Sequence, residues 1–226
     1  MAVNTTDHWD LYERNFSKFR MQGYLQRCGG DRTKAIQLYD WNVLVSQEFW
    51  GLIAYIEVAL RNSLANRLID RSIQKGYQSH WVFDEKGELG RGLAPGSKNR
   101  GPYLKIVDAE RQVKSNNKAA IPEQIVSEIA FGFWIQLVSQ KQIKFWPDLA
   151  GAFPNAESRS QIQIQPMLAK LRDFRNRIGH HHRIWNLDLE TQMAEILRIA
   201  KCIDLDLEHH LESINQLNSI LLARPI

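Results

Sequence analysis

The feature that most constrains the fold is a series of apolar residues recurring every three or four positions across residues 41–68. This spacing places the apolar side chains on one face of an α-helix, a face that other elements must bury. Asp31 follows a pair of glycines and is a favourable N-cap. We therefore expect a helix from Arg32 to about Ile73, with a break near Gly51, because some 40 residues is long for a globular helix. The apolar positions are Trp41, Leu44, Val45, Leu52, Ile56, Ala59, Leu60, Leu64 and Leu68.

The rest of the chain repeats the helical spacing, with almost no strand-like alternation. Residues 76–101 are rich in glycine and polar residues and are expected to form a long loop too polar to pack. Gly179 is placed to end the helix before it. We expect one all-α domain over residues 1–226, a compact bundle of about six to eight helices with a helical C-terminal part at 187–226. The further helices are expected at His8–Met21, Pro102–Ser115, Pro122–Gln140, Ser160–Ile178, Asp188–Cys202 and Asp204–Leu222.

Composition limits the class of protein. Apolar residues make up 44% of the 226 and charged residues 24%, which is ordinary for a globular protein. Cys28 and Cys202 are far apart and lack CxxC spacing, so neither a disulfide framework nor a zinc site is expected. The N-terminal residues lack a signal pattern, and no uncharged stretch is long enough to span a bilayer. We expect a cytoplasmic protein with no membrane association.

The net charge of +4 is unevenly distributed. Residues 91–118 contain seven basic and two acidic residues, and residues 170–183 contain five and one, whereas residues 187–212 contain two and seven. This pattern is compatible with a solvated mixed-charge surface, or with one positive face that binds a polyanion such as RNA. The candidate RNA-binding residues are Lys98, Arg100, Arg172 and Arg177.

The segment LRDFRNRIGHHHRI at residues 171–184 carries the candidate catalytic residues. Asn176 and His180 are four positions apart and share a helix face. Arg175 lies on an apolar stripe, where a charge needs a partner such as a carboxylate or phosphate. The alternatives are a surface arginine–histidine pair, or a metal site. Adjacent histidines point in different directions, so no metal is expected.

A second segment, EVALRNSL at residues 57–64, carries polar residues within the long helix. Glu57 and Arg61 are spaced to form a salt bridge within the helix. The same pair could instead face Arg175 from a neighbouring helix, and the sequence leaves both possibilities open. Spacing gives Asn62 no defined role.

Together these segments resemble a known family. Four landmarks occur in order, and a tryptophan-then-proline loop, KFWPDLAGAFP, also matches. The sequence is similar to the Abi-like (abortive infection) proteins of bacteria, within the HEPN superfamily, over about residues 35–186. The landmarks are LYDWN (38–42), EVALRN (57–62), IAFGFW (129–134) and RNRIGHH (175–181).

The superfamily's motif is an arginine followed four to six residues later by a histidine, often with asparagine directly after the arginine. His180, His181 and His182 all satisfy this spacing from Arg175. We select His180, because it alone shares a face with Asn176 and because the family uses the first histidine of the pair. The family often places an acidic residue soon after the histidines, where this chain has Arg183.

The resemblance implies an endoribonuclease that needs neither metal nor cofactor and acts as a toxin or phage-defence effector. The RNA's 2′-hydroxyl would attack the phosphate and leave a 2′,3′-cyclic phosphate. His180 would move a proton, Arg175 would stabilise the phosphoryl charge and Asn176 would position either group. The supporting residues would be Glu57, Arg61, Asn62 and His181.

The resemblance also implies partners. A homodimer would bring a second histidine to a composite site, and an antitoxin protein or antitoxin RNA could restrain the toxin. Two other functions remain open. The chain could be a non-catalytic module that binds RNA or a nucleotide, or it could be an interaction subunit of a defence system.

Overall fold

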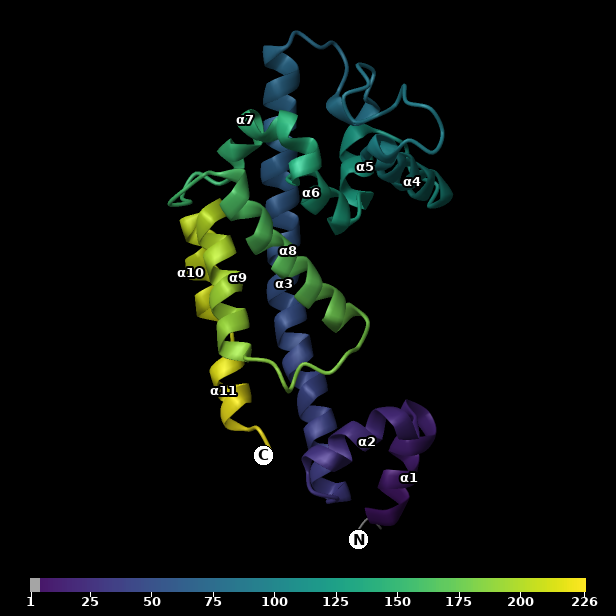
Figure 1. The fold of residues 1–226 in the computed structure, drawn as a ribbon, viewed down its shortest axis with the longest axis vertical. Helices are drawn as coiled ribbons and strands as arrows, with labels where there is room; N and C mark the ends of the chain where they lie inside the picture. The colour runs from purple at the N-terminus through teal and green to yellow at the C-terminus, as the bar shows by residue number, and fades with distance from the viewer. Residues whose placement is uncertain (1–4) are drawn as a thin grey trace.

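The long helix expected from the apolar stripe is the axis of the molecule. The computed structural model describes residues 5–226; residues 1–4, the start of the expected domain, lie outside the described residues. Helix α3 (Arg32–Gln74) is 43 residues long and extends through most of the molecule (Figure 1). Asp31 caps it as expected, accepting a hydrogen bond from the Lys34 amide at 3.0 Å. The expected break near Gly51 is wrong, because other helices pack along the length of α3 and support it as one element.

The N-terminal segment forms two helices beside the start of α3, where one was expected over residues 8–21. These are α1 (Thr5–Phe16) and α2 (Lys18–Arg27). Ser17 separates them with a φ of 72°, and its hydroxyl accepts a hydrogen bond from the Arg20 amide at 3.3 Å. The serine therefore caps α2 and changes the direction of the chain. The spacing of the apolar residues does not predict this break between the helices.

The middle of the chain surrounds the other end of α3 (Figure 1). Helix α4 (Gly101–Ser115) begins at the expected proline turn. The single helix expected over 122–140 is instead α5 (Pro122–Glu128) and α6 (Phe131–Leu137), separated by extended backbone at Ile129 and Ala130. The segments η3 (Gln140–Phe145), α7 (Trp146–Leu149) and η4 (Ala150–Ala152) follow.

The C-terminal helices cover the side of α3. Helix α8 (Gln161–Gly179) occupies the expected range and α9 (Leu189–Ile203) starts at its Asp188 cap. The helix expected over 204–222 is divided into α10 (Leu205–Ile214) and α11 (Leu217–Leu222). The all-α class is confirmed, and residues 5–226 form eleven α-helices rather than six to eight because several expected helices are divided.

Residues 76–101 pack against the protein, contrary to the expectation that they are too polar to do so. The loop contains two 3-10 turns, η1 (Trp81–Phe83) and η2 (Lys98–Arg100), and it buries Trp81, Val82 and Leu89. These three apolar side chains attach the glycine-rich segment to the core.

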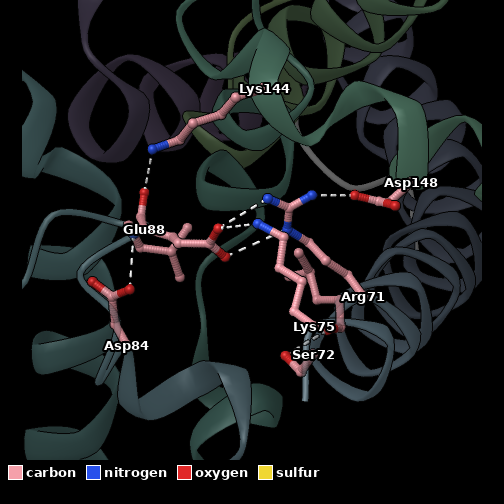
Figure 2. A network of polar contacts seen from close by, with 9 residues as sticks. Arg71, Ser72, Lys75, Asp84, Glu88, Lys144 and Asp148 are labelled. Carbon is pink, nitrogen blue, oxygen red and sulfur yellow. Dashed lines mark hydrogen bonds and ion pairs between the residues drawn. The ribbon is translucent and has the colours of Figure 1, made fainter. Parts of the chain in front are cut away.

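A polar network also fastens this loop to α3 and α7 (Figure 2). Glu88 accepts hydrogen bonds from Arg71 at 2.9 Å and from Lys75 at 2.6 Å. Arg71 also binds Asp148 of α7, and Lys144 donates to the Glu88 carbonyl at 2.5 Å. Partial burial alone would raise the pKa of Glu88, but the hydrogen bonds from Arg71 and Lys75 outweigh it and lower this pKa to about 2.

Glu88 should therefore contribute to acid stability. Its pKa is lowered on folding from an ordinary 4.5, so its contribution is complete above pH 4.5 and is lost as the pH falls toward 2. We expect Glu88→Gln to lower the free energy of unfolding at pH 7 by about 2 kcal/mol, measured by urea denaturation. The variant should also lose less stability than the wild type between pH 4.5 and 2. Glu85→Gln, at an exposed position in the same loop, is the control, and equal pH dependence in both variants would contradict this assignment.

Candidate active site

Arg175 of α8 is held against the middle of α3. Helix α8 lies obliquely across α3 (Figure 1), and the Arg175 Nε donates to the Glu57 Oε1 at 2.7 Å. The guanidinium carbon lies 4.9 Å from the centre of the Trp50 ring, within range of a cation–π interaction. The side chains of Arg175 and Glu57 are 31% and 26% exposed. The expectation that Arg175 needs a partner is confirmed, and the partner is a carboxylate.

The contact also decides between the two possibilities left open for Glu57. Glu57 faces Arg175 across the helix pair and forms no salt bridge with Arg61. Arg61 turns toward the α5–α6 junction, where its Nη1 donates to the Ser127 carbonyl at 3.2 Å. Its Nε lies 3.4 Å from the Asn62 Oδ1, so Asn62 contacts Arg61 rather than Arg175.

The Glu57 contact uses one edge of the guanidinium. Among residues 5–226, neither terminal nitrogen of Arg175 donates a hydrogen bond. Arg175 also lines an open groove between α3, the α5–α6 junction and α8, which we call the arginine groove. It is lined by Arg61, Arg172, Arg175 and Asn176 together with Glu57 and Glu128, and by apolar residues that include Ala54 and Val58. The groove can admit an anionic group beside Arg175.

The histidines occupy the end of α8. The amide of His181 donates to the Ile178 carbonyl at 2.8 Å, and that of His182 donates to the Arg177 carbonyl at 2.9 Å. This paired arrangement is a Schellman motif, whose left-handed position is normally glycine. Here His181 occupies it, with a φ of 55°. The helix ends at Gly179 as expected, and the left-handed residue of its cap is His181 rather than the glycine.

Gly179 has a different role. A Cβ atom at this position would lie 3.4 Å from the Trp50 ring and 3.5 Å from the Arg175 Nη1. Gly179 therefore packs closely against both Trp50 and Arg175 at the last turn of α8. His180 follows directly as the C-cap residue, is exposed, and lies with its ring 6.2 Å from the His182 ring.

Asn42 holds the chain just after the histidines. Its side chain is 6% exposed, and its Oδ1 accepts hydrogen bonds from the amides of Ile184 at 2.8 Å and Trp185 at 3.0 Å. The first landmark, LYDWN, thus holds the chain just after the last landmark, RNRIGHH. Burying a polar residue in this way requires such partners.

The sequence reasoning missed Asn42 and Trp50. Asn42 could have been recognised from the sequence, because it is a polar residue next to Trp41 on the apolar stripe of α3. Trp50 carried no comparable signal, because its role depends on where α8 crosses α3.

The candidate RNA-binding residues fall into two regions. Arg172 lines the arginine groove and pairs with Asp173, whereas the Arg177 Nε donates to the Arg183 carbonyl at 2.8 Å near the histidines. Lys98 and Arg100 lie in η2, before α4. No contact among the described residues joins Lys98 or Arg100 to Arg175.

Among residues 5–226, no group of three or more histidine, cysteine or acidic side chains is arranged to hold a metal ion. Helix α3 is long and apolar enough to span a membrane by length and composition, and 33% of its most apolar window is buried. Core helices of soluble proteins meet the same criterion. Several large apolar side chains of α3, including Val43, Trp50 and Val58, are exposed.

These features define an all-α protein in which two crossing helices position an Arg-Asn pair just before a histidine. The chain belongs to the Abi-like protein family, whose model matches residues 6–186. The match includes α8 and the Arg175–His180 segment, and membership suggests a role in abortive infection, a form of phage defence. No curated protein and no solved structure matches the chain.

Proposed function

We propose that the protein is an endoribonuclease of the HEPN superfamily that acts in phage defence. The observation that carries the proposal is the orientation of Arg175. Glu57 holds the Nε edge, the terminal nitrogens donate no hydrogen bond within residues 5–226, and Arg175 lines the arginine groove. A planar guanidinium presented in this way can donate two hydrogen bonds to the oxygens of one phosphodiester.

The proposed reaction needs no cofactor. One histidine accepts the proton of the RNA's 2′-hydroxyl, and the resulting oxygen attacks phosphorus. The bond from phosphorus to the 5′-oxygen breaks, and a second histidine donates a proton to that oxygen. The products are a 2′,3′-cyclic phosphate and a 5′-hydroxyl. Arg175 stabilises the negative charge that develops on the phosphoryl oxygens, and Asn176, exposed in the same groove, orients the phosphate.

We assign the proton transfers to His180 in each of two copies of the chain. His180 is exposed at the end of α8, whereas the backbone of His181 is committed to the left-handed position of the helix cap. One His180 cannot serve as both base and acid in one step, which favours a homodimer with a composite site.

The uncovered face of α3 supports such a dimer. Val43, Trp50 and Val58 are 41%, 42% and 46% exposed and recur at helical spacing. The face extends from the arginine groove, past Arg175, to a second groove lined by Tyr39, Val43, Trp50 and Gly51. An apolar face of this extent beside a proposed active site is typical of a subunit interface.

A toxic ribonuclease also needs restraint. We propose that an antitoxin, either a protein or an RNA, holds the enzyme inactive in the cytoplasm until infection. The family membership supports this context.

The direct test is cleavage of labelled single-stranded RNA in EDTA. We expect the wild type to leave cyclic phosphate ends. His180→Ala and Arg175→Ala should each lower the cleavage rate by at least about 100-fold, since each removes a group that acts in the transition state. Equal cleavage by all three proteins would contradict the proposal, as would a requirement for added metal.

The matched control is His181→Gly, which removes a neighbouring histidine and relieves the left-handed backbone at that position. This variant should retain cleavage and fold at least as stably as the wild type. If His181→Gly is inactive and His180→Ala is active, the catalytic role belongs to His181.

The dimer can be tested at Gly51, in the middle of the uncovered face. Nothing lies within 4 Å of a Cβ atom placed there, so the folded monomer has room for a side chain. We expect Gly51→Glu to fold with unchanged or higher stability, because glycine inside a helix costs about 1 kcal/mol relative to alanine. Light scattering should show that it is monomeric, and its cleavage should fall with dimer content. Asn66→Glu, at another exposed position of α3, is the control, and a dimeric, active Gly51→Glu protein would contradict this interface.

A further inference from the structure

Two segments without carboxylates meet next to His180. Residues 14–30 and 174–187 contain no aspartate or glutamate, and both contain several arginines. They lie far apart in the sequence, yet the Arg20 Nη1 donates to the His181 carbonyl at 2.7 Å. Helix α2 therefore rests against the end of the segment that carries the candidate catalytic residues.

Further contacts gather arginines at this junction. A Cβ atom on Gly23 of α2 would lie 2.5 Å from the Arg183 Nη1, so Arg183 crosses α2 where a side chain is missing. Arg183 and Arg27 both lie over the Trp185 ring, at 5.6 Å and 6.0 Å from its centre. Arg177 joins them through its 2.8 Å hydrogen bond to the Arg183 carbonyl. We call Arg20, Arg27, Arg177 and Arg183 the arginine cluster.

The cluster has no neutralising partner within the described part of the chain. None of its four guanidiniums forms a salt bridge to a carboxylate of residues 5–226, in contrast to Arg71 and Arg175. Three of the acidic residues that flank the two segments have other partners, since Asp31 caps α3, Asp173 binds Arg172 and Asp188 caps α9. Four cations are thus held near one another without a counter-charge, which favours an anionic ligand.

The buried Tyr24 beneath the cluster is consistent with this geometry. Burial raises the pKa of Tyr24 to about 12, although the positive charges of Arg20 and Arg183 act to lower it. Both guanidiniums therefore lie close to the same tyrosine, on one side of α2.

We propose that the arginine cluster binds the phosphate backbone of single-stranded RNA and guides it to His180. This inference rests on the proposed ribonuclease function and adds a substrate-binding surface to it. RNA is favoured over an acidic protein because the cluster continues a row of cations. The row begins in the arginine groove with Arg61, Arg172 and Arg175, of which the last two are paired with Asp173 and Glu57, and it passes the histidines at the end of α8. Phosphates spaced along one strand match such a row, and guanidiniums bind them through paired donors.

The test measures binding of a labelled, unstructured RNA of about 20 nucleotides, long enough to span several phosphate-binding positions. His180→Ala is used as the parent, so that the RNA stays intact. Arg27→Gln and Arg183→Gln are introduced together, which leaves the Arg20 contact with His181 in place. Lys118→Gln with Arg198→Gln is the matched control, because it removes the same charge from exposed positions outside the cluster. Circular dichroism and thermal unfolding establish that each protein is folded.

We expect the cluster variant to bind RNA about 10-fold more weakly than its parent near 0.1 M salt. The slope of log affinity against log salt should fall by about 1.4, or roughly 0.7 for each phosphate of a single strand that an arginine no longer neutralises. The control variant should change affinity by less than about 2-fold. Equal weakening in both variants, or no weakening in either, would overturn the proposal. Displacement of the RNA by polyglutamate at matched charge as effectively as by unlabelled RNA would also overturn it, in favour of an acidic protein surface.

The two proposals can fail separately. If the wild type binds RNA through the cluster and does not cleave it, the ribonuclease proposal fails and the binding surface stands. If the wild type cleaves RNA and Arg27→Gln/Arg183→Gln binds and cleaves equally well, the binding surface fails and the ribonuclease proposal stands.

Discussion

The contact between Glu57 and Arg175 is the constraint on which the arrangement of the site depends. A cation on an otherwise apolar helix stripe is unfavourable unless a carboxylate compensates it. The compensation comes from the middle of α3, and the Trp50 ring covers a face of the same guanidinium. Because Arg175 is anchored at this point, the last turn of α8 and the histidines after it have a fixed position. Gly179 packs closely against both stacked groups.

The end of α8 separates two kinds of group. Arg175 is partly buried and held in one orientation. A group that stabilises negative charge on phosphoryl oxygens in the transition state works best when it is already in position. His180 is exposed at the helix end, where it can reach a substrate or a second copy of the chain. Arg20 holds the backbone at His181, and Asn42 holds it just after the histidines, at Ile184. In the function that we propose, this division places a fixed phosphate-binding group just before a proton-transferring group.

Much of this arrangement could be predicted from the sequence, because it depends on local patterns. The apolar spacing indicated the extent of α3, and Asp31 indicated its start. The sequence predicted that Arg175 needs an anionic partner, such as a carboxylate or phosphate. That the partner is Glu57 depends on how α8 crosses α3. The helix breaks at Ser17, Ile129 and Asn215 were not predicted. A change of backbone conformation at one residue hardly alters the spacing of the apolar residues around it. The packing of residues 76–101 was missed because a few anchors, including Trp81 and Leu89, outweigh a polar composition.

The most direct test of the central claim is a double-mutant cycle between Glu57 and Arg175, measured as the single-turnover rate of RNA cleavage. If Glu57 acts by orienting Arg175, Glu57→Gln should slow cleavage about 10-fold in the wild-type background and have no further effect in Arg175→Ala, a coupling of about 1.4 kcal/mol. Equal effects of Glu57→Gln in both backgrounds would show that the two residues act independently and would contradict the claim.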